Sequence, residues 1–382
     1  MDLAIEQQVR FVLIAGDLYD GNWKNFQTGM FFVQQAARLR MAGIPLFVIA
    51  GNHDAANKMT RSLPLPDNVT FFSADAPHTV VLEEIDVAIH GQSFATAEIF
   101  EDLSLAYPPA VRGCFNVGLL HTSADGREDH DRYAPCSLDG LKLKGYDYWA
   151  LGHIHKREIL NQEPCIVFSG NIQGRHNREA GPKGCYVVDV DDSGQVTATF
   201  QALDVLRWEV ARVDVTTAVD VDDVLPCVQE ELERLRAASE SRPLAVRVQL
   251  SGTTPLHRQL QAEHEAWMHH IRGLALDAGQ GQVWIEKVQL LTSEPRRTVT
   301  TGGVDEAAVG ELVALFAQLR DDPGLLASIG CDLDGIVKKL PPELKARFRL
   351  GTTNGPWLRE VLEQAEGLLL HRLQAGGHGS RP

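Results

Sequence analysis

The sequence predicts a layered α/β (α+β) protein, in which a β-sandwich flanked by helices is followed by a small βαβαβ unit and a helical tail. Three observations carry this prediction. Apolar strand-like runs alternate with a helical stretch near the start, many short strand-like runs follow, and the last part of the chain has only helical spacing. Because 382 residues are long for one domain, we expect three parts, at 1–205, 206–292 and 293–382.

The first part opens in strand–helix–strand order. An apolar run predicts a strand at 11–15, helical spacing predicts a helix over 27–41 that ends at Gly43, and a second strand follows at 45–50. Shorter strands are then predicted at 79–82, 86–91, 116–121, 148–152, 166–169, 185–190 and 197–202. We expect these strands to form two packed sheets.

The second part alternates strands at 208–215, 243–250 and 283–291 with helices at 221–238 and 257–275, which gives the order βαβαβ. The tail is predicted to hold helices at 304–320, 325–340 and 356–374, and a disordered Gly-rich end at 375–382. Two tail helices have apolar faces that suit packing within the protein or against a partner helix: Val309, Leu312, Val313 and Phe316; Leu358, Val361, Leu362 and Leu368.

Composition limits the class of protein. The net charge of −15 argues against a broad basic face for nucleic acid. No apolar run approaches the roughly 20 residues of a membrane helix, and no signal peptide is visible. The six cysteines are scattered without a C-x-x-C pair, which favours reduced thiols in the cytoplasm over a disulfide frame or a zinc site.

Polar motifs stand at the ends of predicted strands, where ligands bind in layered α/β folds. They are Gly16–Asp20, Gly51–Asp54, His121–Ser123 and Gly152–His155. Taken singly, each has an ordinary interpretation as a helix cap, a turn, a core histidine or a solvated loop. Four such motifs in one layered unit instead favour a shared metal centre.

The first two motifs offer oxygen ligands and a proton donor. Asp17 can bridge two divalent ions about 3.5–4 Å apart, and Gly16 lets backbone and cation approach closely. Asn52 offers a carbonyl oxygen. His53 is a candidate to donate a proton or stabilise charge on a phosphate, and Asp54 is a candidate to orient its imidazole.

The last two motifs offer imidazoles. His121 ends an apolar strand, and the other motifs support its interpretation as a metal ligand. In an extended segment His153 and His155 would point to one side, where they can bind one metal or two adjacent ones. Ligands from Asp, Asn and His without Cys suit Mn²⁺ best, with Mg²⁺ or Fe as alternatives.

In this order, the motifs resemble those of the calcineurin-like metallophosphoesterases, and most closely those of bacterial DNA-repair exonucleases of the SbcD type, especially the YhaO-like branch. The stretches 169–176 and 184–188 are similar to the segment that follows the last metal motif in that branch. The βαβαβ unit resembles the family's capping domain. The resemblance spans residues 1 to about 290, and the tail matches only in its helical character.

The resemblance implies roles for individual residues. Asp17 would bridge two metal ions, His155 would serve the first site, and His53 would be the catalytic histidine. The second site would be completed by Asn52, His121 and His153. Arg175 would reach a substrate phosphate, although a basic side chain after a strand is usually solvated.

The sequence departs from the family pattern at its start. The family's first strand ends in Asp-x-His, which supplies two further ligands, whereas residues 1–10 already resemble the helix after that strand. We therefore expect either a start codon assigned too late or a truncated gene. The alternative is a protein that holds one metal and is catalytically weak.

These observations leave three hypotheses for function. The first is a metal-dependent DNA phosphodiesterase, an exonuclease in double-strand break repair; the resemblance implies a homodimer and an SMC-like ATPase partner with coiled coils. The second is a phosphodiesterase that acts on a cyclic nucleotide or another small diester, which the acidic composition favours. The third is a weakly catalytic scaffold that binds DNA ends or the ATPase.

Overall fold

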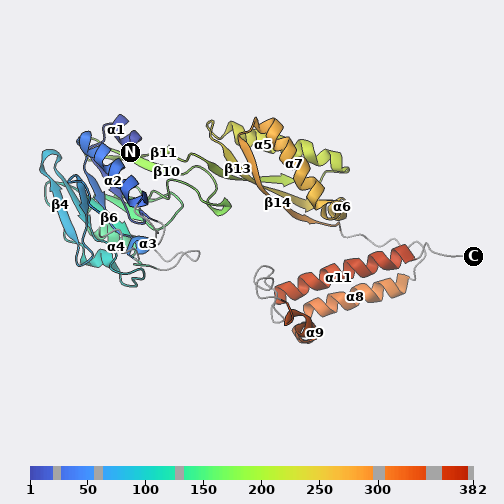
Figure 1. The fold of residues 1–382 in the computed structure, drawn as a ribbon. Coiled ribbons are helices and arrows are strands. Elements are labelled where there is room, and N and C mark those ends of the chain that lie inside the picture. The colour runs from blue at the N-terminus through green and yellow to red at the C-terminus, as the bar shows by residue number, and fades with distance from the viewer. Residues whose placement is uncertain (20–26, 56–62, 125–132, 296–305, 341–354, 377–382) are drawn as a thin grey trace, which may run out of the picture. The chain divides into compact units, whose positions relative to one another are not determined.

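The computed structural model describes residues 1–19, 27–55, 63–124, 133–295, 306–340 and 355–376. The chain forms two compact units, Met1–Glu294 and Pro295–Pro382 (Figure 1). The three-part division predicted from the sequence, with boundaries at residues 205 and 292, stays a prediction.

The first unit opens with a three-stranded parallel sheet. Its strands, in spatial order, are β1 (Val12–Ile14), β2 (Leu46–Val48) and β3 (Val69–Phe71). Two helices lie in the same stretch, α1 (Asp2–Glu6) and α2 (Gln27–Met41). The buried face of α2, with Phe32, Ala36 and Leu39, shares one apolar cluster with Leu46 and Val48 of β2. The predicted helix therefore has the expected bounds, and its apolar stripe holds it on the sheet.

A second sheet, with six strands, packs against the first. In spatial order its strands are β4 (His78–Leu82), β5 (Val87–Gly91), β6 (Phe115–His121), β7 (Tyr148–Gly152), β9 (Cys165–Phe168) and β8 (Glu158–Asn161). The four central strands are parallel, and the edge strands β4 and β8 are antiparallel to their neighbours. Strands β3 and β8 were not predicted from the sequence, because they are short and none of their residues is fully buried.

One apolar core joins the two sheets. Phe47, from the first sheet, and Phe72, just after it, pack with Ile89, Val117 and Leu119 of the second sheet. The hairpin of β10 (Gly184–Val190) and β11 (Val196–Ala202) packs against the same cluster. The predicted sheet-on-sheet sandwich is thus confirmed, and helix α4 (Leu138–Leu143) covers part of the outer face of the larger sheet.

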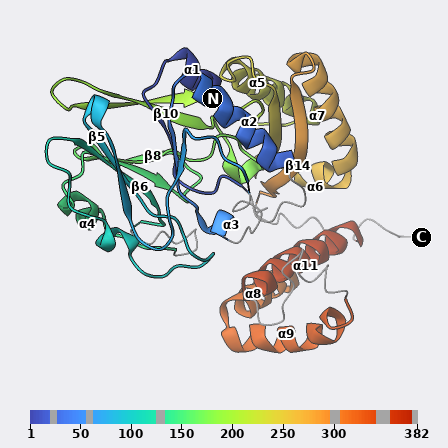
Figure 2. The same ribbon diagram turned by 60° about the vertical axis from the view of Figure 1, so that its left-hand side comes forward.

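The rest of the first unit is the predicted βαβαβ segment. Its strands β12 (Arg207–Asp214), β13 (Leu244–Thr253) and β14 (Val283–Ser293) form a sheet in that order, with every pairing parallel. The helices are α5 (Val224–Ala237), α6 (His257–Ala262) and α7 (His264–Gly279). Figures 1 and 2 show α5 and α7 side by side against this sheet. The single helix predicted at 257–275 is two helices, because the backbone at Glu263 departs from helical geometry.

The second unit contains α8 (Glu306–Asp321), α9 (Pro323–Val337) and α11 (Gly355–Gly376). Phe316, Leu326, Leu358 and Leu362 are buried together, so these apolar faces pack within the unit itself. The predicted positions 304 and 305 of α8 and the end 377–382 lie outside the described residues, as do the side chains of Val309 and Leu368. Across the described residues, no helix is long and apolar enough to cross a membrane.

Candidate metal centre

Side chains from both sheets meet at the carboxyl ends of four strands. Asp17 follows β1, Asn52 begins the short helix α3 (Asn52–Ala55) after β2, His121 is the last residue of β6, and His153 follows β7. Because β1 and β2 are parallel, as are β6 and β7, each pair of strands ends at one edge of its sheet. The sandwich then brings the two edges together.

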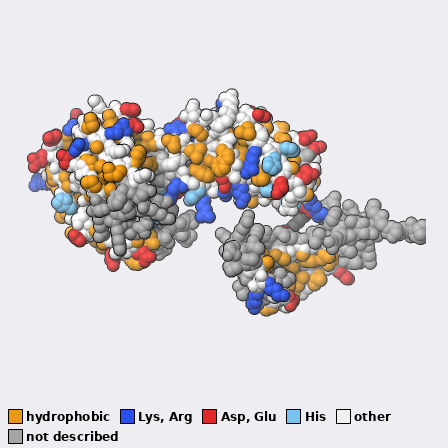
Figure 3. Space-filling model, viewed as in Figure 1, with side chains coloured by type: hydrophobic (Ala, Val, Ile, Leu, Met, Phe, Trp, Pro, Cys, Tyr) orange, Lys and Arg blue, Asp and Glu red, His pale blue; other side chains and the backbone are white. Residues whose placement is uncertain are grey.

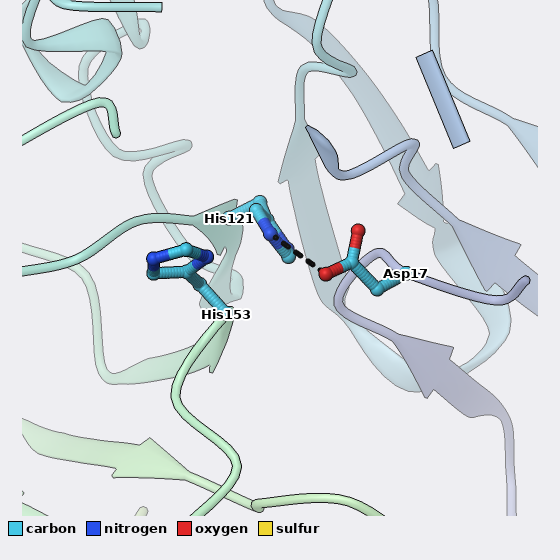
Figure 4. A group of neighbouring side chains, drawn as sticks. All are labelled: Asp17, His121 and His153. Atoms are coloured by element: carbon cyan, nitrogen blue, oxygen red, sulfur yellow. Dashed lines mark ion pairs between the residues drawn. The ribbon is translucent and has the colours of Figure 1, made fainter. Parts of the chain in front are cut away.

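The distances describe a compact group. The Nε2 atom of His121 is 3.4 Å from Oδ2 of Asp17, as Figure 4 shows. The same nitrogen is 3.0 Å from Oδ1 of Asn52. The same Asn52 oxygen is 3.3 Å from Nδ1 of His153. Ligand atoms of Asp17, His121 and His153 all lie within 4.8 Å of one another. The structure therefore brings four of the predicted metal ligands together.

The tautomer of His121 follows from its other ring nitrogen. Nδ1 lies 2.8 Å from the carbonyl oxygen of Ala15, and a carbonyl can only accept, so Nδ1 carries a proton and donates it. In the neutral ring Nε2 then presents a lone pair to two oxygens that also carry lone pairs. A bound cation would resolve this repulsion, and such a backbone partner is typical of histidines that bind metals.

Two glycines permit this close approach. A Cβ at Gly51 would lie 2.3 Å from Oδ1 of Asp17, and one at Gly16 would lie 2.5 Å from Nδ1 of His121. Gly16 also has φ +91°, and Asp17 itself has φ +52°. The left-handed backbone at these two residues turns the chain after β1, so that the carboxylate faces the imidazoles.

Electrostatics keep Asp17 ionised. Burial acts to raise the pKa of this carboxyl group, but His121, which donates from Nε2 and carries a charge when its ring is protonated, and the backbone N–H of His53 outweigh burial and lower the pKa below its ordinary value. The His53 N–H donates to Oδ1 of Asp17 at 3.0 Å, so the start of α3 is fixed beside the site.

The carboxylate of Asp54 accepts three hydrogen bonds from backbone N–H groups, which the sequence did not predict. Its Oδ2 accepts from the N–H groups of Leu18 and Gly51 at 3.0 and 3.1 Å, and its Oδ1 accepts from that of Tyr19 at 3.0 Å. Burial raises the pKa of this carboxyl group, against the lowering effect of these bonds. The side chain thus ties the first motif to the second, and orientation of His53 by Asp54 stays a prediction.

His155 is not in the group, because the backbone does not continue as expected. The prediction assumed an extended segment, but His153 has φ +98°, which breaks the alternation that would turn residues 153 and 155 to one side. Instead, Nδ1 of His155 lies 2.7 Å from Oε1 of Glu179. Its assignment as a metal ligand stays a prediction.

Arg175 contacts the same carboxylate. Its backbone N–H donates to Oε2 of Glu179 at 2.8 Å, and its Nη2 lies 3.5 Å from Oε1. Burial acts to raise the pKa of Glu179, but these donors and His155 hold it at about 2. Glu179 was not predicted from the sequence, since a single acidic residue 24 positions after His155 forms no motif.

The residues present fit a divalent metal ion. One carboxylate, one amide oxygen and two imidazole nitrogens converge, and none of these four ligands is a thiolate. Such a set suits Mn²⁺, Mg²⁺ or Fe better than a soft metal.

Comparison with known proteins points to the same chemistry. The family description "calcineurin-like phosphoesterase" matches residues 1–157, and "metallophosphoesterase YhaO, middle domain" matches residues 208–293. The chain is 32% identical over 385 residues to the uncharacterized metallophosphoesterase YhaO of Bacillus subtilis, which covers 98% of this chain and 88% of that protein.

More distant relatives are named as a DNA double-strand break repair protein and as a subunit of a nuclease. The DNA double-strand break repair protein Mre11 of Sulfurisphaera tokodaii is 28% identical over 205 residues, 50% of this chain and 51% of that protein. One subunit of the nuclease SbcCD of Staphylococcus epidermidis is 25% identical over 234 residues, 53% of this chain and 61% of that protein. All four converging side chains lie within the stretch of residues 1–157 that matches the phosphoesterase description.

Proposed function

The chain belongs to the calcineurin-like metallophosphoesterases, and from this we propose that it is a metal-dependent phosphodiester hydrolase that cleaves DNA, as an exonuclease in double-strand break repair. Family membership supports hydrolysis of phosphoesters with divalent metal ions. DNA as the substrate and repair as the role are the proposed part. The observation that carries the proposal is the convergence of Asp17, Asn52, His121 and His153 at the ends of four strands.

The proposed roles follow from the positions of these side chains. Asn52, His121 and His153 would hold the second metal ion, His155 would serve the first, and Asp17 would serve both. When bound, such ions neutralise phosphate oxygens and lower the pKa of an attacking water. The Ala15 carbonyl keeps His121 in the tautomer that presents Nε2 to the site. Asp54 acts through the backbone by fixing Leu18 and Gly51, which neighbour Asp17 and Asn52.

Two side chains are proposed to act on the substrate. The backbone of His53 lies beside Asp17, since its N–H donates to that carboxylate. The imidazole of His53 would give a proton to the departing oxygen. Arg175, which contacts the same carboxylate as His155, would contact a phosphate oxygen. The side chain of Arg175 is 44% exposed, and its Nη2 lies 3.5 Å from one oxygen of Glu179.

The proposal extends to cofactor and partners. We propose Mn²⁺ as the metal, because it suits mixed oxygen and imidazole ligands. We also propose a homodimer and an SMC-like coiled-coil ATPase as partners, by likeness to the nuclease relatives. The cytoplasm is the proposed location, since the six cysteines form no disulfide among the described residues.

The charge of the chain favours a second candidate substrate. The net charge is −15, and on the face drawn in Figure 3 acidic and basic side chains are interspersed over the described parts. Long DNA is attracted by basic surfaces, whereas a small or cyclic nucleotide needs only local contacts. A phosphodiesterase for small diesters is therefore the alternative.

One experiment separates these candidates. The full chain is incubated with Mn²⁺ and either linear duplex DNA or a small chromogenic phosphodiester. Preference for DNA supports the proposal, and turnover of the small diester alone supports the alternative. His53→Ala should abolish hydrolysis with metal content largely unchanged, whereas His269→Ala, at an exposed position on α7, should match the parent. Wild-type rates for His53→Ala would refute its role.

A further inference from the structure

Glu179 is a nearly buried acidic residue in direct contact with a histidine of the proposed site. It ends a short helical turn, η4 (Asn177–Glu179), and its side chain is 6% exposed. Oε1 lies 2.7 Å from Nδ1 of His155, and Oε2 accepts the N–H of Arg175 at 2.8 Å. Both carboxylate oxygens are therefore engaged, and one of them faces the imidazole.

This contact determines which nitrogen of His155 carries the proton. An ionised carboxylate can only accept, so Nδ1 of His155 donates to Glu179, and Nε2 of the neutral ring is the nitrogen with the lone pair. Nδ1 of His121 is protonated for the same reason, because it donates to the Ala15 carbonyl. Carboxylates that accept from the second nitrogen of a metal-binding imidazole fix its orientation and raise its basicity.

The backbone of His155 is fixed as well. Its carbonyl oxygen accepts from Nζ of Lys183 at 3.0 Å and from the N–H of Asn171 at 3.3 Å. Gly170, with φ +72°, packs so closely that an added Cβ would lie 2.8 Å from the same oxygen. His155 is thus held on its side chain and on its main chain by the segment that follows it.

That segment is tied in turn to strand β12. Nε1 of Trp208 donates to the carbonyl of Gly174 at 3.1 Å, and the N–H of Gly181 donates to the carbonyl of Trp208 at 2.8 Å. Gln173 donates to the carbonyl of Leu206 at 2.7 Å. Residues 173–181, which include Glu179, are therefore anchored near both ends to the first strand of the βαβαβ segment.

We propose that Glu179 is a positioning residue, which orients His155 and leaves its Nε2 to bind a divalent cation, and that Trp208 holds the segment carrying Glu179. This rests on the proposed function in so far as His155 is a metal ligand of the hydrolase. The geometry predicts a definite ring tautomer in the full chain without any substrate. The proposal therefore has a readout that does not depend on catalysis.

The first measurement is the ¹⁵N spectrum of the full chain labelled at histidine, at a pH where the rings are neutral. The His155 signals are assigned with a His155→Asn variant. We expect protonated Nδ1 and unprotonated Nε2 in the wild type, and a mixture of tautomers in Glu179→Ala. A wild-type His155 protonated at Nε2 would overturn the proposal.

The second measurement is Mn²⁺ affinity by calorimetry. We expect Glu179→Ala to bind about 10- to 100-fold more weakly, as for other partners of metal-binding imidazoles. Glu179→Gln should recover part of the lost affinity, since its amide oxygen still accepts from Nδ1. If the Glu179→Ala protein does not fold, Glu179→Gln takes its place in the measurement. Trp208→Phe, which loses only the bond to Gly174, should shift affinity in the same direction by less. Glu231→Gln removes a carboxylate that is paired with Arg234 on α5 and should change nothing.

Wild-type affinity in both Glu179 variants would overturn the role of Glu179, and wild-type affinity in Trp208→Phe would overturn that of Trp208. On a chromogenic phosphodiester we expect Glu179→Gln to lower kcat with little change in KM. If the wild type keeps the expected tautomer and Mn²⁺ affinity but cleaves no phosphodiester, the proposed function fails and the positioning role stands. If the wild type cleaves the diester while His155 has the other tautomer, the positioning role fails and the proposed function stands.

Discussion

Replacement of Gly51 by alanine tests whether the site depends on its close packing. The added Cβ would lie 2.3 Å from Oδ1 of Asp17 and 2.6 Å from Cε1 of His121. Ordinary contact begins at 3.4 Å, so the carboxylate must retreat by about 1.1 Å. Gly51 is not among the glycines with positive φ, so the effect arises from this crowding alone.

The size of the effect follows from that displacement. A misplacement of about 1 Å at a reacting centre costs on the order of 100-fold in rate, and overpacking costs about 1–3 kcal/mol of stability. We expect Gly51→Ala to weaken Mn²⁺ binding and to lower phosphodiesterase activity about 100-fold, while the protein stays folded. Calorimetric titration with Mn²⁺, turnover of a chromogenic diester and thermal unfolding measure the three quantities.

The matched control is Gly273→Ala, in the middle of α7, where an added Cβ meets nothing within 4 Å. It should be neutral or slightly stabilising, because alanine favours a helix over glycine by about 1 kcal/mol. Mn²⁺ affinity and turnover of Gly51→Ala equal to those of this control would refute the reasoning, since the site would then not require contact between Asp17 and His121.

Three further predictions concern stability. Gly118→Ala would place a Cβ 2.2 Å from the ring of Trp149, so urea unfolding should show a loss of about 1–3 kcal/mol. Asp204→Ala would leave the guanidinium of Arg207, only 2% exposed, without its buried partner, and should cost about 3–5 kcal/mol in the same assay. The carboxyl of Glu179 has a folded-state pKa of about 2 against an ordinary 4.5, so its contribution to stability is present above 4.5 and is lost as the pH falls toward 2. The difference in unfolding free energy between wild type and Glu179→Gln should shrink over that range, and a difference independent of pH would contradict the assignment.

The sequence predicted those parts of the fold that depend on periodicity. The apolar spacing of residues 27–41 matches α2 in both bounds, and the alternation in β13 places Leu244, Val246, Val248 and Leu250 in one buried row. The short strands β3 and β8 were missed, because three or four half-buried residues carry too little pattern.

The site residues that directly follow strands were predictable from the sequence. Those whose side-chain orientation depends on the conformation of a loop were not. Asp17, Asn52, His121 and His153 converge because parallel strands end at one edge. His155 lies outside the group formed by Asp17, His121 and His153, and the φ of +98° at His153, which interrupts the expected extended segment, is not predictable from a residue pattern. The three backbone bonds to Asp54 are equally invisible in the sequence, since any carboxylate there could have faced solvent.

The ligands of the candidate centre are distributed between two sheets, and this has a consequence for the order of assembly. Ala15 and His121 are separated by 106 positions, and Asn52 and His153 by 101. A nascent chain on the ribosome cannot close the centre until residue 153 has emerged and the second sheet has docked on the first. We therefore expect metal binding to come late in folding, and a bound cation would link the two sheets to each other.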